Sequence, residues 1–349
     1  MNSPKEWRFN IRNSLGGVII SLIVTIGVLL FIVRGDIDKL FHGLLSANMK
    51  LVFLAISIYF LEVALWAGRW KVALGAIDQD ISFGKIYLIC QGGKFVTNVT
   101  PIMKAGGDPF RAYFAKKIHG IPYNEGLGTL LAETAVSIPV FLSFLTVGLF
   151  FWLYMQGLVL IPIIVLILMI SGVIFFLPFV NWLIARETAL EHLASFLNWI
   201  NEKLGRESNS KKIIKSLKKL YKSTNFVMKH KKSGFFMIIL SILLYTFTIV
   251  RFYVIFLALG LEVSWYVPFL GSTLPFIFGL IPFSPGGLIY VEGGMTGLLI
   301  LMGIERSAAT SAVIIERGIS YLISTIAGGI AASYLGLKIW KNNSDEEED

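Results

Sequence analysis

Residues 98–111 hold the most informative arrangement of polar side chains in the chain. Asp108 and Pro109 form a favourable helix start, with Asp as the cap and Pro at the first helical position. Lys104 precedes this start, and Arg111 follows on its first turn. Exposed amides at a helix start and two nearby cations suit a phosphate group. The segment predicts a lipid phosphate site formed by Lys94, Asn98, Lys104, Gly106, Gly107, Asp108 and Arg111.

The alternative for this segment is a turn at the membrane surface whose cations only follow the positive-inside rule. Lys94 favours the phosphate site, because it lies inside the apolar segment just before the turn. A cation within an apolar segment is costly and often functional.

A second candidate site consists of ionisable residues in otherwise apolar sequence. Glu292 lies between two glycine pairs, where a carboxylate is costly unless it meets a cation, a proton or water. Arg317 is its expected partner. The predicted intramembrane polar gate comprises Glu133, Arg251, Pro285, Gly286, Gly287, Glu292, Glu316 and Arg317. The alternative is a set of ion pairs that only hold helices together.

The elements that position these residues are expected to be membrane-spanning helices. The chain is 55% hydrophobic and 15% charged, with a mean hydropathy of +0.73, whereas soluble domains carry about 25% charged residues. Six apolar runs are long enough to contain a span: residues 15–33, 51–67, 127–155, 158–180, 235–259 and 308–337. The expected fold is therefore an all-α polytopic membrane protein with about six transmembrane helices.

Two further apolar segments, residues 86–103 and 267–302, are interrupted by proline, glycine and polar residues. Such backbone is tolerated in a membrane only where protein or water surrounds it. We expect re-entrant helical hairpins, with eight spans as the alternative if both segments cross. Six spans place the basic N-terminus, loop and C-terminal end on one cytoplasmic side. The hairpins would then enter from opposite sides, as in inverted-repeat transporters.

The charge distribution divides the chain into an integral membrane domain, residues 1–341, and an acidic tail, residues 342–349, that we expect to be disordered. Five of the 22 acidic residues occupy the last five positions, so the net charge of +9 becomes +14 without them. Residues 181–234 form a basic loop with an amphipathic helix suited to anionic lipid, or simply a positive-inside loop. The expected partners are anionic membrane lipids rather than nucleic acid. The sequence leaves open whether the protein forms a homo-oligomer.

Several enzyme and metal-site classes have no signature in the sequence. The single cysteine, Cys90, excludes an internal disulfide and a cysteine metal cluster, and the four histidines are scattered. Walker, Gly-x-Ser-x-Gly and His-Glu-x-x-His motifs are absent. We therefore expect no cofactor, no metal and no catalytic residue, and favour a transporter over an enzyme.

The two polar segments resemble the lysylphosphatidylglycerol synthase transmembrane-region family, also called flippase-like membrane proteins. Residues 104–111 look most like archaeal members. Two positions depart from the family pattern: Asp108 stands where Glu is frequent, and Ile289 stands where glycine would permit a close backbone approach. The matching residues extend along nearly the whole chain: Asn98, Pro101, Lys104, Gly106, Gly107, Asp108, Arg111, Pro285, Gly286, Gly287, Glu292, Arg317 and Tyr321. The resemblance adds Tyr321 to the gate.

In the two-part synthase and flippase proteins, a similar membrane region moves an aminoacylated lipid between leaflets, and a separate soluble domain makes that lipid. Only a short polar tail follows Lys341, so the soluble domain is expected to be absent. The resemblance implies a flippase or scramblase for anionic or phosphate-containing lipids in the cell membrane, with both termini cytoplasmic. The alternatives are a transferase or accessory subunit of envelope glycolipid synthesis, with Glu292 as general base, and a scaffold without transport.

Overall fold

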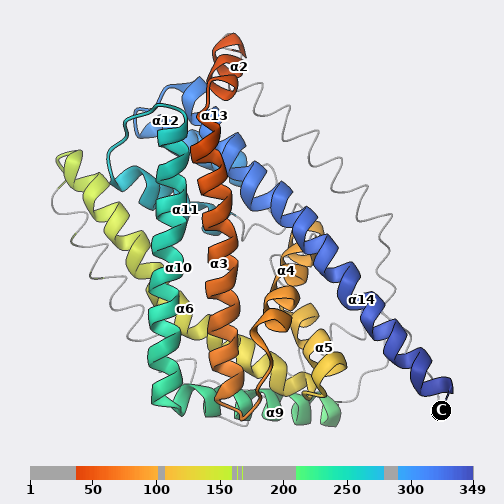
Figure 1. Ribbon diagram of the computed structural model, residues 1–349. Coiled ribbons are helices and arrows are strands. Elements are labelled where there is room, and N and C mark those ends of the chain that lie inside the picture. The colour runs from red at the N-terminus through yellow and green to blue at the C-terminus, as the bar shows by residue number, and fades with distance from the viewer. Residues whose placement is uncertain are drawn as a thin grey trace.

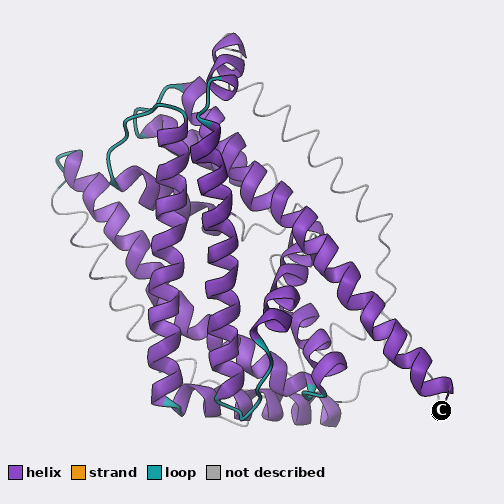
Figure 2. Cartoon of the chain, in the orientation of Figure 1, coloured by secondary structure: helices purple, strands orange, loops and turns teal. Residues whose placement is uncertain are grey.

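Four helices of the computed structural model are long and apolar enough to cross a membrane. They are α3 (Met49–Gly75), α6 (Tyr123–Met155), α10 (Lys231–Ala258) and the continuous segment Arg306–Leu337. The structure describes residues 37–100, 107–158, 163, 167, 210–278 and 290–348, and this part of the chain consists of helices and loops without a strand (Figure 2). The protein is an all-α, multi-pass membrane protein.

These four helices coincide with four of the predicted spans, although α3 is longer than predicted. The sequence predicts that this span ends before Arg69, whereas α3 continues to Gly75 and Arg69 is only 6% exposed. Arg69 has buried partners, described below, so its charge does not mark a membrane surface. The predicted spans 15–33 and 158–180 lie outside the described residues, apart from 158, 163 and 167.

α3 and α10 run antiparallel through the bundle, and α6 crosses beside them (Figure 1). The backbone N–H of Asn48, the residue before α3, donates to the backbone carbonyl of Ala258, the last residue of α10, at 2.7 Å. α2 (Ile37–Leu45) lies at this end of the bundle, and α9 (Ser210–Lys229) lies across the opposite end. We refer to them as the α2 end and the α9 end.

α4 (Phe83–Val99) and α5 (Gly107–His119) pack together as a first hairpin that starts and finishes towards the α9 end (Figure 1). Their 17 and 13 residues are fewer than the roughly 20 that a span requires. α4 ends at Val99 because Thr100 precedes a proline. Thr100 therefore has an extended backbone, with φ −95° and ψ 136°.

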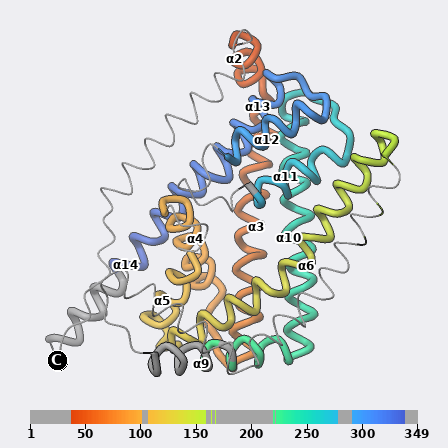
Figure 3. Tube along the Cα trace, turned by 180° about the vertical axis from the view of Figure 1, so that it is seen from behind, coloured from red at the N-terminus to blue at the C-terminus, as the bar shows by residue number. Residues whose placement is uncertain are grey.

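α11 (Tyr266–Phe278) and α12 (Tyr290–Leu301) form a second packed pair. They follow the C-terminus of α10 and precede α13 (Arg306–Arg317), so this hairpin starts and finishes at the α2 end (Figure 3). The arrangement agrees with the predicted pair of hairpins that enter from opposite sides. Residues 101–106 and 279–289, which connect the arms, lie outside the described residues.

The final membrane segment changes helix type along its length. α13 continues into a π-helical turn, η2 (Gly318–Ile323), and then into α14 (Ser324–Glu348). α14 includes residues 342–348 of the acidic tail, and the division between membrane domain and tail stays a prediction. Extending an existing helix adds a hydrogen bond per residue without a new nucleation cost, so a polar tail can continue it.

α9 lies within the basic loop 181–234, of which the structure describes residues 210–234, and it packs on the first turns of α6. The Ser223 and Thr224 hydroxyls donate to the backbone carbonyls of Glu125 and Gly128, at 3.2 and 3.1 Å. Gly128 permits this contact, since a Cβ there would lie 2.6 Å from Ser223. The helix is thus anchored to the bundle, while its contact with anionic lipid remains a prediction.

Gly328 lets α14 cross α4 at close range, and this contact yields a first testable prediction. A Cβ at Gly328 would lie 2.4 Å from the backbone oxygen of Gln91. Gly328→Ala should therefore lower the free energy of unfolding by about 1–3 kcal/mol, measured by denaturant titration in mixed micelles. Gly336→Ala, on the same helix with open space at its Cβ, is the matched control. It should stabilise the protein by about 0.5–1 kcal/mol, and equal effects of both variants would contradict the prediction.

Candidate functional site

The first hairpin is bound to the final membrane segment through Asn98, which lies one residue before the end of α4. Its side-chain amide donates to the Tyr321 carbonyl at 3.3 Å and to the Thr325 hydroxyl at 3.0 Å. In return, the Tyr321 hydroxyl donates to the Asn98 carbonyl at 3.3 Å. The predicted residues Asn98 and Tyr321 are thus in direct contact, at the π-helical turn.

The second hairpin is bound to the same part of the final segment through Glu292, on the first turn of α12. Arg317 Nε donates to Glu292 Oε1 at 2.5 Å, and the guanidinium lies 5.2 Å from the centre of the Tyr321 ring. Glu292 is only 2% exposed, and its Oε2 has no hydrogen-bond partner among the described residues. The predicted partner of Glu292 is therefore present, and the two hairpins meet at Arg317 and Tyr321.

A buried ion triad lies beside this meeting point. Arg251 of α10 donates through Nε to Glu62 of α3 at 2.8 Å, and through Nη1 to Glu316 of α13. Arg251 is 4% exposed, and the side chains of both glutamates are 12% exposed. One cation is thus shared by two carboxylates from two other helices. We call these three residues the Arg251 triad.

A second ion cluster joins the first hairpin to α3 and α6, nearer the α9 end. Glu133 of α6 accepts from Arg69 Nη2 at 2.9 Å and from Arg111 Nη2 at 2.8 Å. Arg111 also donates to Asp108 at 3.0 Å, and Arg69 donates to Ser241 of α10 at 3.0 Å. We call Arg69, Asp108, Arg111 and Glu133 the Glu133 cluster. Its charges balance, because two cations meet two carboxylates.

Two tryptophans of α3 complete the environment of Arg111. Its guanidinium lies 4.2 Å from the centre of the Trp66 ring and 4.5 Å from that of Trp70. The Trp70 indole in turn donates to the Thr129 hydroxyl at 3.0 Å. Arg111 is therefore stacked, paired and 1% exposed, which suits it to hold the hairpin in place rather than to receive a lipid from outside.

Lys94 differs from these arginines because no ion pair holds it within the described part of the chain. It is partly exposed on α4, and its ammonium lies 5.1 Å from the centre of the Trp66 ring. A cation on an aromatic face keeps donors free for other acceptors, since ammonium groups have three N–H donors. Among the predicted phosphate ligands that the structure describes, Lys94 is the cation suited to receive an anion.

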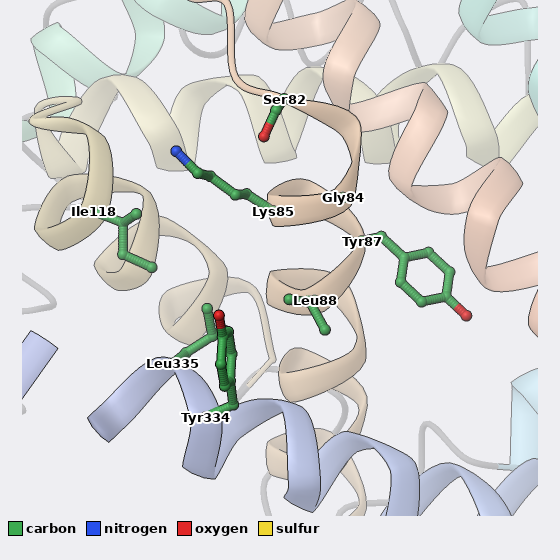
Figure 4. Close-up of a pocket in the computed structure, with 8 residues that line it drawn as sticks. All are labelled: Ser82, Gly84, Lys85, Tyr87, Leu88, Ile118, Tyr334 and Leu335. Atoms are coloured by element: carbon green, nitrogen blue, oxygen red, sulfur yellow. The ribbon is translucent and has the colours of Figure 1, made fainter. Parts of the chain in front are cut away.

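A groove of about 490 Å³ lies between the start of α4, the end of α5 and α14 (Figure 4). Lys85, Ile118 and Tyr334 face this space from the three helices, whereas Tyr87 points to the other side of α4. The lining contains none of the predicted site residues. The ion clusters therefore lie inside the bundle and not in this surface groove.

Comparison with known proteins decides the family. The family described as the lysylphosphatidylglycerol synthase TM region matches residues 18–328. The chain belongs to this family. The resemblance of its two polar segments to the family is thereby confirmed.

Archaeal members of similar length are matched almost from end to end. A UPF0104 membrane protein of Methanocaldococcus jannaschii is 25% identical over 341 residues, which cover 95% of this chain and 96% of that protein. One from Methanothermobacter thermautotrophicus is 25% identical over 335 residues, covering 94% and 97%. One from Pyrococcus horikoshii is 24% identical over 318 residues, covering 88% and 95%.

Several predicted residues take a different place from the one expected. Asp108 lies in the first turn of α5 and not at its cap, because the helix already begins at Gly107. Its carboxylate accepts from Arg111, one turn later. Glu133 belongs to the cluster with Arg69 and Arg111, and not to a single group with Arg251 and Glu316.

The backbone around Gly107 explains why glycine is found there. A Cβ would lie 2.3 Å from the Thr97 hydroxyl and 2.8 Å from the Gly93 carbonyl, so the arms of the first hairpin touch at this position. The remaining predicted residues fall outside the described part of the chain: Lys104, Gly106, Pro285, Gly286 and Gly287. Their roles stay predictions.

Sequence reasoning left Glu62, Arg69, Trp66 and Trp70 out of the candidate site. Glu62 and Arg69 are seven residues apart, which is two helical turns, so one face of the helix carries both. That spacing was the available signal. Within the described residues, no three of the His, Cys, Asp and Glu side chains are grouped as a metal site would require.

Proposed function

We propose that this membrane protein moves lipids with an anionic or phosphate-containing headgroup between the leaflets of the cell membrane. The observation that carries the proposal is the meeting of two hairpins from opposite ends at Arg317 and Tyr321. Transporters with inverted repeats place their site where such broken helices meet. The π-helical turn at the same place supports the proposal, because π-turns are frequent at functional sites.

Within this proposal, Lys94 is the cation of the described residues that binds the lipid headgroup. It lies four residues before Asn98, one turn along α4 from the meeting point. Glu292 and Arg317 form the gate, since a lipid headgroup passing them must compete with a buried ion pair. The basic loop 181–234 supports cytoplasmic termini through the positive-inside rule.

The direct test is exchange of fluorescent phosphatidylglycerol between leaflets of liposomes that contain the purified protein. The wild type should exchange the lipid faster than empty liposomes do. Lys94→Ala should slow exchange about 10- to 100-fold, the loss expected for one hydrogen bond to a charged group. Lys94→Arg should retain part of the rate because it keeps the charge.

Lys116→Ala is the matched control, because Lys116 is an exposed lysine on the neighbouring helix α5. Its rate should equal that of the wild type. Exchange by folded wild-type protein no faster than in empty liposomes would reject the transport proposal. Equal rates for Lys94→Ala and wild type would remove Lys94 from the headgroup site.

A membrane transferase in envelope glycolipid synthesis is the second candidate. The observation in its favour is the Oε2 atom of Glu292, which is buried and has no partner among the described residues. A carboxylate oxygen in that condition could accept a proton from an attacking hydroxyl. This candidate requires product from a lipid-linked donor, and loss of that product in Glu292→Gln. Lipid exchange without any product would favour transport.

A further inference from the structure

The ion clusters described above and Lys94 together contain equal numbers of acidic and basic side chains, but these are unevenly paired. The basic ones are Arg69, Lys94, Arg111, Arg251 and Arg317, and the acidic ones are Glu62, Asp108, Glu133, Glu292 and Glu316. The Glu133 cluster and the pair of Glu292 with Arg317 are each neutral. The Arg251 triad has one carboxylate in excess, and Lys94 has no ion pair in the described chain.

The excess charges lie near each other without touching. The Lys94 ammonium lies 5.1 Å from the centre of the Trp66 ring, and Trp66 is one helical turn after Glu62 on α3, yet no ion pair joins Lys94 to Glu62. Inside a protein the interaction between two such charges remains strong over distances at which water would screen it. Lys94 therefore balances the negative triad from a distance, and the triad and Lys94 together are neutral while no other anion binds Lys94.

This balance changes when an anion occupies Lys94. A headgroup with one negative charge neutralises the ammonium, and the triad then keeps an uncompensated negative charge in a low-dielectric interior. An uncompensated buried charge is expensive, and a carboxylate removes that cost by taking up a proton. We propose that the Arg251 triad takes up a proton when an anionic lipid headgroup binds at Lys94, so that lipid and proton move together.

The proton comes from solvent and forms an O–H bond with a carboxylate oxygen of Glu62 or Glu316, while the headgroup keeps its own charge. A buried hydroxyl lies close to this position. Tyr59, one turn before Glu62 on α3, is 2% exposed and its hydroxyl has no hydrogen-bond partner within the described residues. It interacts electrostatically with both Glu62 and Arg251, and faces Ser324 without a hydrogen bond of normal geometry.

Other charged and titratable groups surround the triad from the neighbouring helices. α4 contributes Lys94, and also Tyr87 beside Tyr59. Arg317, next to Glu316, is held by Glu292 of α12 and faces the Tyr321 ring of η2. Arg317 is thus already balanced by its own carboxylate. Lys94 is the group in this set whose charge an incoming anion can cancel without breaking an ion pair of the described chain.

The first test measures protons directly on the unmodified protein. Short-chain phosphatidylglycerol is added to the purified protein in weakly buffered detergent with a pH-indicator dye, and binding is measured in parallel. The inference rests on the proposed function and predicts uptake of up to about one proton per bound headgroup. Phosphatidylcholine, whose headgroup has no net charge, should cause no uptake. Binding of phosphatidylglycerol without proton uptake overturns the inference, whereas absence of binding overturns the proposed function.

The second test follows lipid exchange at about pH 6 and about pH 8, on either side of neutrality. Because the loaded state holds an extra proton, linkage requires tighter binding of phosphatidylglycerol at the lower pH. With the lipid below saturation, exchange should then be faster at the lower pH by about fivefold or more. Glu62→Gln should lose this pH response, since it removes the excess carboxylate and leaves Arg251 and Glu316 as a neutral pair. Glu305→Gln, an exposed glutamate paired with Lys39, should keep it. If the wild-type protein exchanges lipid faster than empty liposomes do, but at the same rate at both pH values, the inference is overturned and the proposed function stands.

Discussion

Glu133→Ala is expected to lower the free energy of unfolding by about 3–5 kcal/mol, the cost of removing one partner from a buried salt bridge. The effect should be at the upper end of this range, because Glu133 is the shared acceptor of Arg69 and Arg111. Both guanidiniums lie in the interior, and neither can reach water without moving α3 or the first hairpin. Denaturant titration in mixed micelles measures the loss.

Glu305→Ala provides the control for the loss of a glutamate as such. Glu305 pairs with Lys39 at the surface, with side chains 59% and 63% exposed, and an exposed pair contributes only about 0–1 kcal/mol. Glu133→Gln should lie between the two, because it keeps the shape and one acceptor but removes the charge. A Glu133→Ala protein as stable as Glu305→Ala would mean that the cluster does not hold the first hairpin.

The broken segments show what could be predicted from sequence alone. Pro101 and the glycine pairs predict that neither segment is a simple span, because freed backbone groups cannot face lipid. The described arms agree with that prediction. Glu292 and Arg317 could also be paired in advance, since an isolated intramembrane carboxylate requires a cation.

The grouping of the other charges could not be predicted in the same way. Arg69 follows an apolar run, so a hydropathy window places it at a membrane surface, although it is buried. Glu133 lies ten residues into α6, about 15 Å from its start, and Arg251 lies 20 residues into α10, about 30 Å from its start. Both helices start at the α9 end, so the two side chains lie at different depths. The difference in depth between Glu133 and Arg251 depends on how the helices are arranged, and it cannot be predicted from the spacing of these residues in the sequence.

Arg251→Met is the second substitution for which we expect a large loss, about 3–5 kcal/mol of unfolding free energy. Methionine fills much of the volume but leaves Glu62 and Glu316 facing each other without a cation. The loss should therefore come from the two carboxylates and not from missing packing. Substitution of the two carboxylates distinguishes repulsion between them from a packing defect.

Glu62→Gln and Glu316→Gln, introduced together with Arg251→Met, should restore most of the lost stability, since neutral amides can hydrogen-bond to each other. The same pair of glutamines in the presence of Arg251 should destabilise the protein, because a buried guanidinium would then lack a carboxylate. Opposite effects of one pair of substitutions in the two backgrounds are the signature of a charge-balanced triad. Equal effects in both would show that Arg251 packs between α3 and α13 without depending on their charges, and the triad would then have no reason to exchange a proton.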